Sequence, residues 1–232
     1  MEQQIRLVPK SRPLSLVICM PGRSYSNRFL ICWSEFMLAC WRNGIQLQIS
    51  QNYDPVVYYA RNKCLGGHVL RGRNQKPFDG KMTYDYMVWI DSDILFNYDQ
   101  VMKLISLNKD IAAGLYVMED GQNFAAVRNW DEEYFAKNGT FQFIHRDELK
   151  DQKDPVEVCY SGMGLFVVKN GVFESLEYPW FRPIFHDLSK DGRDIYDFAS
   201  EDAALCLRLR EKGYKIVIDP TVVVGHEKSL VL

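Results

Sequence analysis

The sequence has no apolar run long enough to cross a membrane. A spanning helix needs roughly 20 apolar residues, and the apolar run at 14–20 is much shorter. The first residues, Met1 to Gln4, are polar and do not have the pattern of a signal peptide. We therefore expect a cytoplasmic protein without a transmembrane segment.

A strong charge of either sign is also missing. The chain has 28 basic and 30 acidic residues in 232, which gives a formal net charge of -2. Binding to nucleic acid through overall charge needs a clear basic excess. We therefore expect no nucleic-acid partner.

Cysteine patterns typical of zinc sites are absent as well. The six cysteines are scattered, with no Cys-x-x-Cys pair and no Cys/His spacing that suits zinc. Several lie inside apolar segments, where a free cysteine acts as a small core residue. This favours free thiols in a reducing compartment, with a disulfide as the alternative.

Strands and helices alternate in the first half of the chain. Apolar runs predict strands at 14–20, 45–49, 86–90 and 111–117. A helix capped by Ser26 or Asn27 is expected to end at Asn43-Gly44, and further helices are expected at 54–65 and 99–107. This alternation predicts an α/β fold with a mixed, mainly parallel, Rossmann-like sheet flanked by helices.

The second half is less regular. Residues 119–154 show no clear pattern and no domain boundary, and 178–193 are interpreted as a loop or lid. Strands are expected at 156–160 and 165–168, a helix at 199–212, and two late strands at 214–218 and 221–224, separated by Asp219-Pro220. We expect one domain over 1–232.

Two carboxylates, Asp91 and Asp93, follow the apolar strand at 86–90 with Ser92 between them. Ligands of α/β sheets bind at the carboxyl ends of strands. Magnesium is often held by one or two carboxylates plus substrate phosphates. The alternative is that both residues simply end the strand and cap the following turn.

A second acidic pair, Glu201-Asp202, begins the helix expected near the C-terminus. Such residues commonly cap helices and favour the helix dipole, but a carboxylate in a cleft can instead act as a general base. His226 follows the last strand. It is either an ordinary surface or core histidine or a third metal ligand.

Basic residues could contact phosphate. Arg61 lies in an Ala-Arg-Asn segment, and Arg23 follows the turn Pro21-Gly22 after the first strand. The alternative for Arg61 is a solvated helix face. The aromatic segment 178–181 could stack on a sugar or pack in the core.

The order of these features resembles that of GT-A fold glycosyltransferases of the family 2-like kind. The segments that carry the resemblance are LVICMPGR, YARN, YMVWIDSDILF, DIAAGLYVMED, VCYSGMGLFVVKNGVFESL, PWFRP and SEDAALCLRLREKGYKIVIDPTVVVGHE. The resemblance runs from about Leu14 to Glu227. It is weakest at 119–154, and PGRSYSNRF departs from the usual turn after the first strand.

The resemblance implies a role for each matching residue. Asp91 and Asp93 would form a DxD site that holds Mn²⁺ or Mg²⁺ with His226, and Asp202 of the Glu201-Asp202 pair would be the catalytic base. The residues implied at the donor nucleotide and sugar are Pro21, Arg23, Asp54, Arg61, Asp91, Ser92, Asp93, Gly162 and Gly164. Residues 1–118 would bind the nucleotide and 119–232 the acceptor.

The expected activity is therefore metal-dependent transfer of a sugar from a nucleoside diphosphate donor, with UDP as the expected nucleotide, to a hydroxyl acceptor with inversion. Two alternatives remain. One is a retaining transferase on the same fold, and the other is a nucleotide- or sugar-binding module without turnover.

Overall fold

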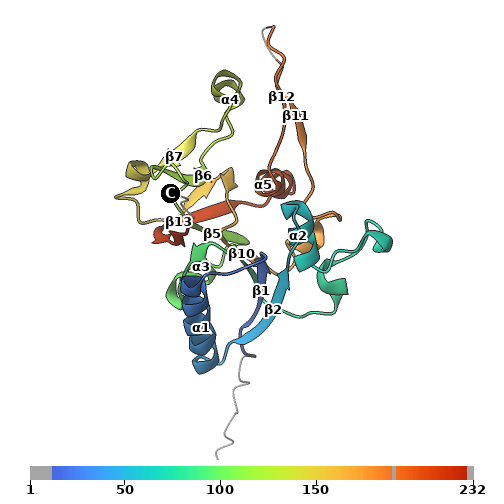
Figure 1. Ribbon diagram of the computed structural model, residues 1–232, viewed down its shortest axis with the longest axis vertical. Coiled ribbons are helices and arrows are strands. Elements are labelled where there is room, and N and C mark those ends of the chain that lie inside the picture. Colours follow the sequence, from blue (N-terminus) through green and yellow to red (C-terminus); the bar gives the residue numbers. More distant parts are fainter. Residues whose placement is uncertain (1–11, 190–191, 229–232) are drawn as a thin grey trace, which may run out of the picture.

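The apolar runs form one seven-stranded sheet with the order β2-β1-β3-β10-β5-β13-β8 (Figure 1). Strands β1, β2, β3, β5 and β13 run in one direction, whereas β10 and β8 run in the other. This confirms the predicted α/β class with a mixed, mainly parallel sheet. The strands are β1 Ser15–Pro21, β2 Gln46–Asn52, β3 Tyr86–Ile90, β5 Ile111–Leu115, β8 Val156–Val158, β10 Leu165–Lys169 and β13 Ile216–Val223.

The computed structural model describes residues 12–189 and 192–228. The polar start Met1 to Gln4 lies outside this part of the chain. Strands from both predicted halves join the central sheet, because β10 lies between β3 and β5. The roles assigned to the two halves stay predictions.

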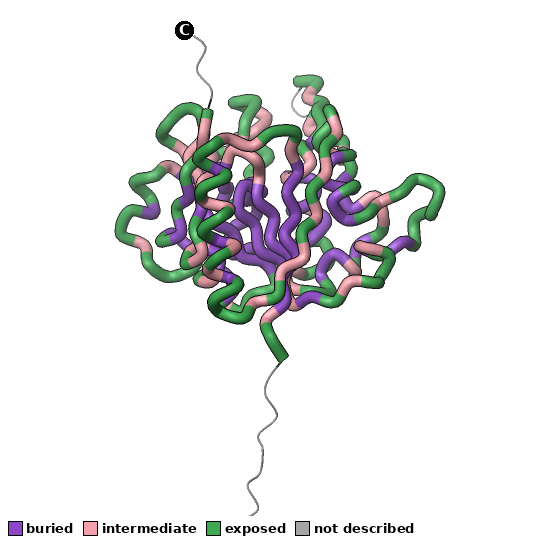
Figure 2. Tube along the Cα trace, turned by 60° about the horizontal axis from the view of Figure 1, so that its bottom comes forward, coloured by how far each residue is buried: buried purple, intermediate pink, exposed green. Residues whose placement is uncertain are grey.

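Helices cover both faces of the sheet. Those packed on it are α1 Asn27–Arg42, α2 Val57–Cys64, α3 Tyr98–Ser106 and α5 Glu201–Glu211, whereas α4 Glu132–Asn138 has no buried residues. Alternate residues of β1 point to opposite faces: Leu16 packs in the cluster that includes residues of α1 and α3, and Val17 in the cluster that includes residues of α2 and α5. Figure 2 shows the resulting buried layer of strands between more exposed helices.

The predicted start of α1 is confirmed by its cap. The Phe29 N–H donates to Ser26 Oγ at 3.0 Å, which satisfies one of the free donors of the first turn.

Residues 119–154, interpreted as irregular, contain ordered elements. Strand β6, Asn123–Val127, pairs with β7, Phe143–His145, and with β9, Tyr160–Ser161. Helix α4 lies between β6 and β7. Strands β7 and β9 have only three and two residues, which is too few to give an alternating pattern in the sequence.

The loop predicted at 178–193 is partly wrong. Strand β11, Phe185–Asp187, pairs with β12, Tyr196–Phe198, and the two form a projecting hairpin (Figure 1). The remaining strands form a small pair at the site described below, β4 Ile94–Leu95 and β14 Gly225–His226.

The predicted break at Asp219-Pro220 is also wrong, because β13 continues through it. Pro220 has no N–H, and the pairing with β5 shifts register between Ile218 and Val223. Asp219 Oδ1 accepts hydrogen bonds from the N–H and hydroxyl of Thr221, at 2.9 and 2.6 Å. These bonds hold the irregular turn within the strand.

The aromatic segment 178–181 packs in the core. The Trp180 and Phe181 side chains are 0% and 1% exposed, and the Asn62 side chain donates to the Phe181 carbonyl at 2.7 Å. Arg208 donates to the carbonyls of Glu177 and Pro179, each at 2.8 Å. Hydrophobic packing is therefore the correct interpretation of this segment.

All six cysteines are free, and only Cys32 is partly exposed. Burial raises the pKa of Cys64 to about 12 and that of Cys40 to about 11, and the thiolate is the reactive form. We expect a disulfide-exchange reagent to modify one thiol rapidly in the native protein and the others only after unfolding. Cys32→Ser should remove the rapid phase; rapid modification of several thiols would contradict this burial.

In the described part of the chain, no helix combines the length and apolar character that crossing a membrane requires.

Candidate functional site

A cavity of about 340 Å³ lies at the carboxyl ends of β1 and β3. These neighbouring strands are parallel, so the turn after β1 and the acidic segment after β3 meet at one edge of the sheet. The cavity brings together these predicted site residues: Pro21, Arg23, Asp54, Arg61, Asp91, Ser92, Asp93 and Glu201.

Arg61 joins two of the acidic segments beneath this cavity. Its Nη1 and Nη2 atoms lie 3.0 and 3.1 Å from the two Asp91 carboxylate oxygens, and its Nε donates to Glu201 Oε1 at 3.1 Å. The Arg61 side chain is only 4% exposed. The guanidinium thus fixes the end of β3 relative to the start of α5.

Arg61, Asp91 and Glu201 shift one another's pKa values. Burial raises the pKa of the Asp91 and Glu201 carboxyl groups, and Arg61 acts in the opposite direction. Burial lowers the pKa of Arg61, but the charges of Asp91 and Glu201 outweigh this effect and raise it. Arg61 therefore remains protonated.

Asp93 faces a different set of residues. Its Oδ2 atom lies 3.2 Å from His226 Nε2 and 3.1 Å from Lys228 Nζ. The backbone holds this contact, because His226 in β14 pairs with Ile94 in β4 and the Glu227 N–H donates to the Asp93 carbonyl at 2.8 Å.

The hydrogen bonds of His226 define how its ring can act. Nδ1 lies 2.8 Å from the Val117 carbonyl, which can only accept, so Nδ1 must donate. In the neutral ring, Nε2 then presents a lone pair to the Asp93 carboxylate. Two acceptors that face each other need a proton or a cation between them. A histidine fixed in this way is a common metal ligand.

The Asp93 carboxylate and the His226 imidazole meet only some of the requirements of a divalent-cation site. A carboxylate oxygen and an imidazole nitrogen suit Mn²⁺, and Mg²⁺ needs few protein ligands when phosphates supply the rest. Asp91, however, is paired with Arg61. Within residues 12–189 and 192–228, no group of three or more acidic, His or Cys side chains is arranged to hold a metal. The three-ligand site stays a prediction.

Asp202 lies in the first turn of α5, where hydrogen bonds fix its carboxylate. The Tyr160 hydroxyl donates to Oδ2 at 2.9 Å, and the Ser200 hydroxyl donates to Oδ1. The Tyr58 hydroxyl of α2 donates to the Ala199 carbonyl at 2.6 Å and anchors the start of α5. Asp202 is therefore held by α2, β9 and α5 together.

Asp54 and Arg23 line another part of the cavity. Asp54 lies 2.6 Å from Lys63 Nζ, and the hydrogen bonds from Lys63 and from the Val56 N–H lower its pKa. The Arg23 guanidinium lies 5.9 Å from the centre of the Tyr53 ring. Both side chains line the cavity. Their contacts with a donor nucleotide stay predictions.

Gly162 and Gly164 lie against Tyr116 rather than along the cavity wall. A Cβ at Gly162 would lie 2.0 Å from the Tyr116 hydroxyl, and one at Gly164 would lie 2.6 Å from its ring. The Gly164 carbonyl also accepts from the Asp91 N–H at 3.0 Å. The two glycines thus make room for Tyr116 beside the acidic segment.

Tyr116, Tyr160 and Lys228 also lie at this site, and none of them was predicted from the sequence. The Tyr116 ring packs edge-on against His226 with centroids 4.8 Å apart. Burial raises the pKa of Tyr116, and the charges of Asp91 and Asp202 raise it further. Tyr116 follows β5 at a strand end, which is a signal that could have identified it. No sequence pattern indicated the other two residues.

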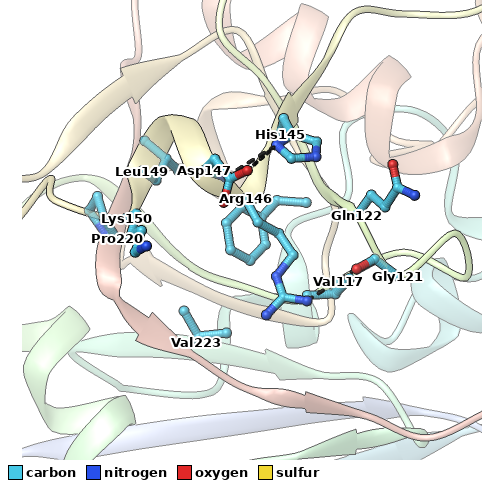
Figure 3. Close-up of a pocket in the computed structure, with 11 residues that line it drawn as sticks. Val117, Gly121, Gln122, His145, Arg146, Asp147, Leu149, Lys150, Pro220 and Val223 are labelled. Carbon is cyan, nitrogen blue, oxygen red and sulfur yellow. Dashed lines mark hydrogen bonds and ion pairs between the residues drawn. The ribbon is translucent and has the colours of Figure 1, made fainter.

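A larger cavity of about 500 Å³ lies elsewhere (Figure 3). It contains none of the predicted site residues. Arg146 crosses it to donate to the Gly121 carbonyl at 3.1 Å, and Val117, whose carbonyl accepts from His226, forms part of its wall.

Comparison with known proteins identifies the fold. No protein-family model and no curated protein sequence matches the chain. Among the solved structures, 68 chains match. One is A197 from STIV, with 15% identity, a TM-score of 0.51, and coverage of 94% of this chain and 96% of that one. The chain has a GT-A-like fold.

A second solved structure is GalNAc-T7 with UDP, GalNAc and Mn²⁺. It matches at 13% identity with a TM-score of 0.49, and the match covers 94% of this chain and 43% of that chain.

Proposed function

We propose that the protein is a glycosyltransferase that moves a sugar from a nucleoside diphosphate donor, with UDP as the expected nucleotide, to a hydroxyl acceptor. The observation that carries the proposal is the cavity at the ends of β1 and β3. It gathers most of the residues that sequence resemblance implies at the donor, although they come from separate segments of the chain.

Asp93 and His226 are the residues proposed to hold a divalent cation, together with Asp91, the third ligand that the resemblance implies. When bound, Mn²⁺ or Mg²⁺ would stabilise the negative charge that develops on the leaving diphosphate. Lys228 lies 3.1 Å from Asp93 and is half-exposed. Its ammonium group can turn toward a phosphate instead.

Asp202 is proposed to accept the proton of the acceptor hydroxyl. The acceptor oxygen forms a bond to the anomeric carbon while the bond from that carbon to the diphosphate oxygen breaks. Tyr160 and Ser200 each donate to Asp202, so they orient its carboxylate. Attack from the face opposite the leaving diphosphate gives inversion.

A hydrolysis screen tests the proposal without knowledge of the acceptor. The protein is incubated with Mn²⁺ and a panel of nucleotide sugars, and release of the free nucleotide is measured. We expect release from at least one UDP-sugar. If no nucleotide sugar is bound or hydrolysed, the proposal is wrong.

Asp93→Ala should lower metal-dependent donor turnover by about a hundredfold or more, because the diphosphate charge loses its stabilisation. The Asp93 side chain is 40% exposed, so the fold should persist. The matched control is Asp99→Ala, an exposed aspartate in the first turn of α3. Near-normal turnover by a folded Asp93→Ala variant would exclude the metal role.

A further inference from the structure

Two large apolar side chains lie exposed in the loop between α2 and β3. Val69 is 76% exposed and Leu70 is 87% exposed, and both belong to the turn Val69–Arg71. Figure 1 shows this part of the chain projecting beyond α2 at the side of the sheet. A single exposed apolar residue is ordinary, but two adjacent residues exposed to this degree at a projecting turn indicate a contact surface.

Hydrogen bonds fix the shape of this turn. His68 Nδ1 accepts from the Leu70 N–H at 3.2 Å. The Gln75 side chain crosses the loop: its Oε1 accepts from the His68 N–H at 2.9 Å, and its Nε2 donates to the Gly72 carbonyl at 2.7 Å. Gln75 is 8% exposed. The loop therefore buries a polar side chain and keeps two apolar ones in solvent, which is the reverse of the usual preference.

The same loop is basic. We call residues 66–81 the basic loop, because they contain four Arg and Lys side chains and one acidic side chain. The four basic residues are all exposed: Arg71, Arg73, Lys76 and Lys81. Asp79 pairs with Arg71 and Lys81, whereas Arg73 and Lys76 form no ion pair within residues 12–189 and 192–228. Since the whole chain has a net charge of -2, this positive charge is local.

We propose that the basic loop docks the protein on an anionic lipid surface. Val69 and Leu70 enter the boundary between the headgroups and the acyl chains, and the basic side chains contact lipid phosphates. Charge complementarity favours this partner. A protein partner fits less well, because two side chains provide only a small part of the about 800 Å² per partner that a stable protein interface buries. The inference is independent of the proposed function.

The exposed face of α1 provides a comparison. Leu30 and Ile31 are 60% and 58% exposed and are also adjacent. They belong to the helix that packs on the opposite face of the sheet to α2. Helix α1 contains two arginines and one glutamate, so its charge is weaker than that of the basic loop. This pair therefore resembles Val69 and Leu70 in size and apolar character but lacks their strongly basic surroundings.

Co-sedimentation with lipid vesicles tests the proposal. The wild type should bind vesicles that contain phosphatidylserine, bind vesicles of phosphatidylcholine alone much more weakly, and be released by salt. The double variant Val69→Ser/Leu70→Ser should bind at least about tenfold more weakly, because it loses the apolar contact. The matched control Leu30→Ser/Ile31→Ser should bind as the wild type does. Both variants change exposed side chains, so their melting temperatures should change little.

Arg73→Gln separates the charge from the apolar contact. Loss of this one cation should weaken binding to phosphatidylserine vesicles about fivefold and leave binding to phosphatidylcholine vesicles unchanged. UDP binding in the presence of Mn²⁺ should be the same in all these variants. Failure of the wild type to bind UDP would overturn the proposed function and leave the lipid-docking role intact.

Four outcomes would overturn lipid docking. The wild type does not bind phosphatidylserine vesicles, or it binds both kinds of vesicle equally. Val69→Ser/Leu70→Ser binds normally, or Leu30→Ser/Ile31→Ser alone loses binding. Light scattering adds a further check, because a dimer that Val69→Ser/Leu70→Ser dissociates would assign the loop to a second copy of the chain and contradict the proposal as well.

Discussion

Asp202→Asn is expected to reduce the rate of sugar transfer by about 10²- to 10⁴-fold, the usual contribution of a general base. The asparagine keeps the shape of the side chain and can still accept one hydrogen bond from Tyr160 or Ser200, but it cannot take the acceptor proton. The rate is measured with the donor found in the hydrolysis screen and a glycoside acceptor.

Binding of UDP separates loss of chemistry from loss of the site. Asp202→Asn should bind UDP as tightly as the wild type, because Asp202 does not line the cavity that holds the proposed donor. The anomeric configuration of the product, read by proton NMR, should be inverted. A retained configuration, or a near-normal rate for Asp202→Asn, would favour the retaining alternative.

Arg61→Met is expected to lower the free energy of unfolding by about 3–5 kcal/mol at pH 7, since it leaves two partly buried carboxylates without a counter-charge. Asp91 and Glu201 both rely on this guanidinium. Chemical denaturation with the change followed by circular dichroism measures the loss.

The pH dependence of that loss follows from the two carboxyl groups. Burial already raises the pKa of Asp91 and Glu201 in the folded protein, and removal of Arg61 raises it further. The loss should therefore be largest above the folded-state pKa values and shrink as the pH falls and the groups are protonated. Equal losses at pH 5 and pH 7 would show that lost packing, rather than charge, dominates.

Lys63→Met is the matched control for Arg61→Met. Lys63 also lies on α2 and pairs with an aspartate, Asp54, but its side chain is 49% exposed. An exposed pair of this kind contributes about 0–1 kcal/mol. A loss for Lys63→Met as large as that for Arg61→Met would contradict the assigned role of burial.

The sequence predicted the elements whose signals are local. Strand β3 was predicted at its observed bounds because its apolar run ends at Asp91, and α1 because Ser26 caps it. Strands β6 and β7 were missed, since β7 has only three residues and β6 pairs with partners that are distant in the sequence. Pro220 falsely indicated a break in β13, because side-chain hydrogen bonds from Thr221 to Asp219 sustain the strand there.

The sequence indicated several residues of the candidate site but not how their side chains pair. Strand-end position indicated Asp91 and Asp93, and the order of motifs indicated Asp202 and His226. Only the structure shows that Arg61 is committed to Asp91 and Glu201, while Asp93 faces His226 and Lys228. These contacts depend on side-chain direction across separate segments, which spacing along the chain does not encode.

Calorimetric titration with UDP, with and without Mn²⁺, tests the central claim most directly. The cavity at the ends of β1 and β3 should bind UDP in the presence of Mn²⁺ and at least tenfold more weakly without it, and Asp93→Ala should bind weakly in both cases. Absence of UDP binding to the wild type, or binding that neither Mn²⁺ nor Asp93→Ala changes, would contradict the account.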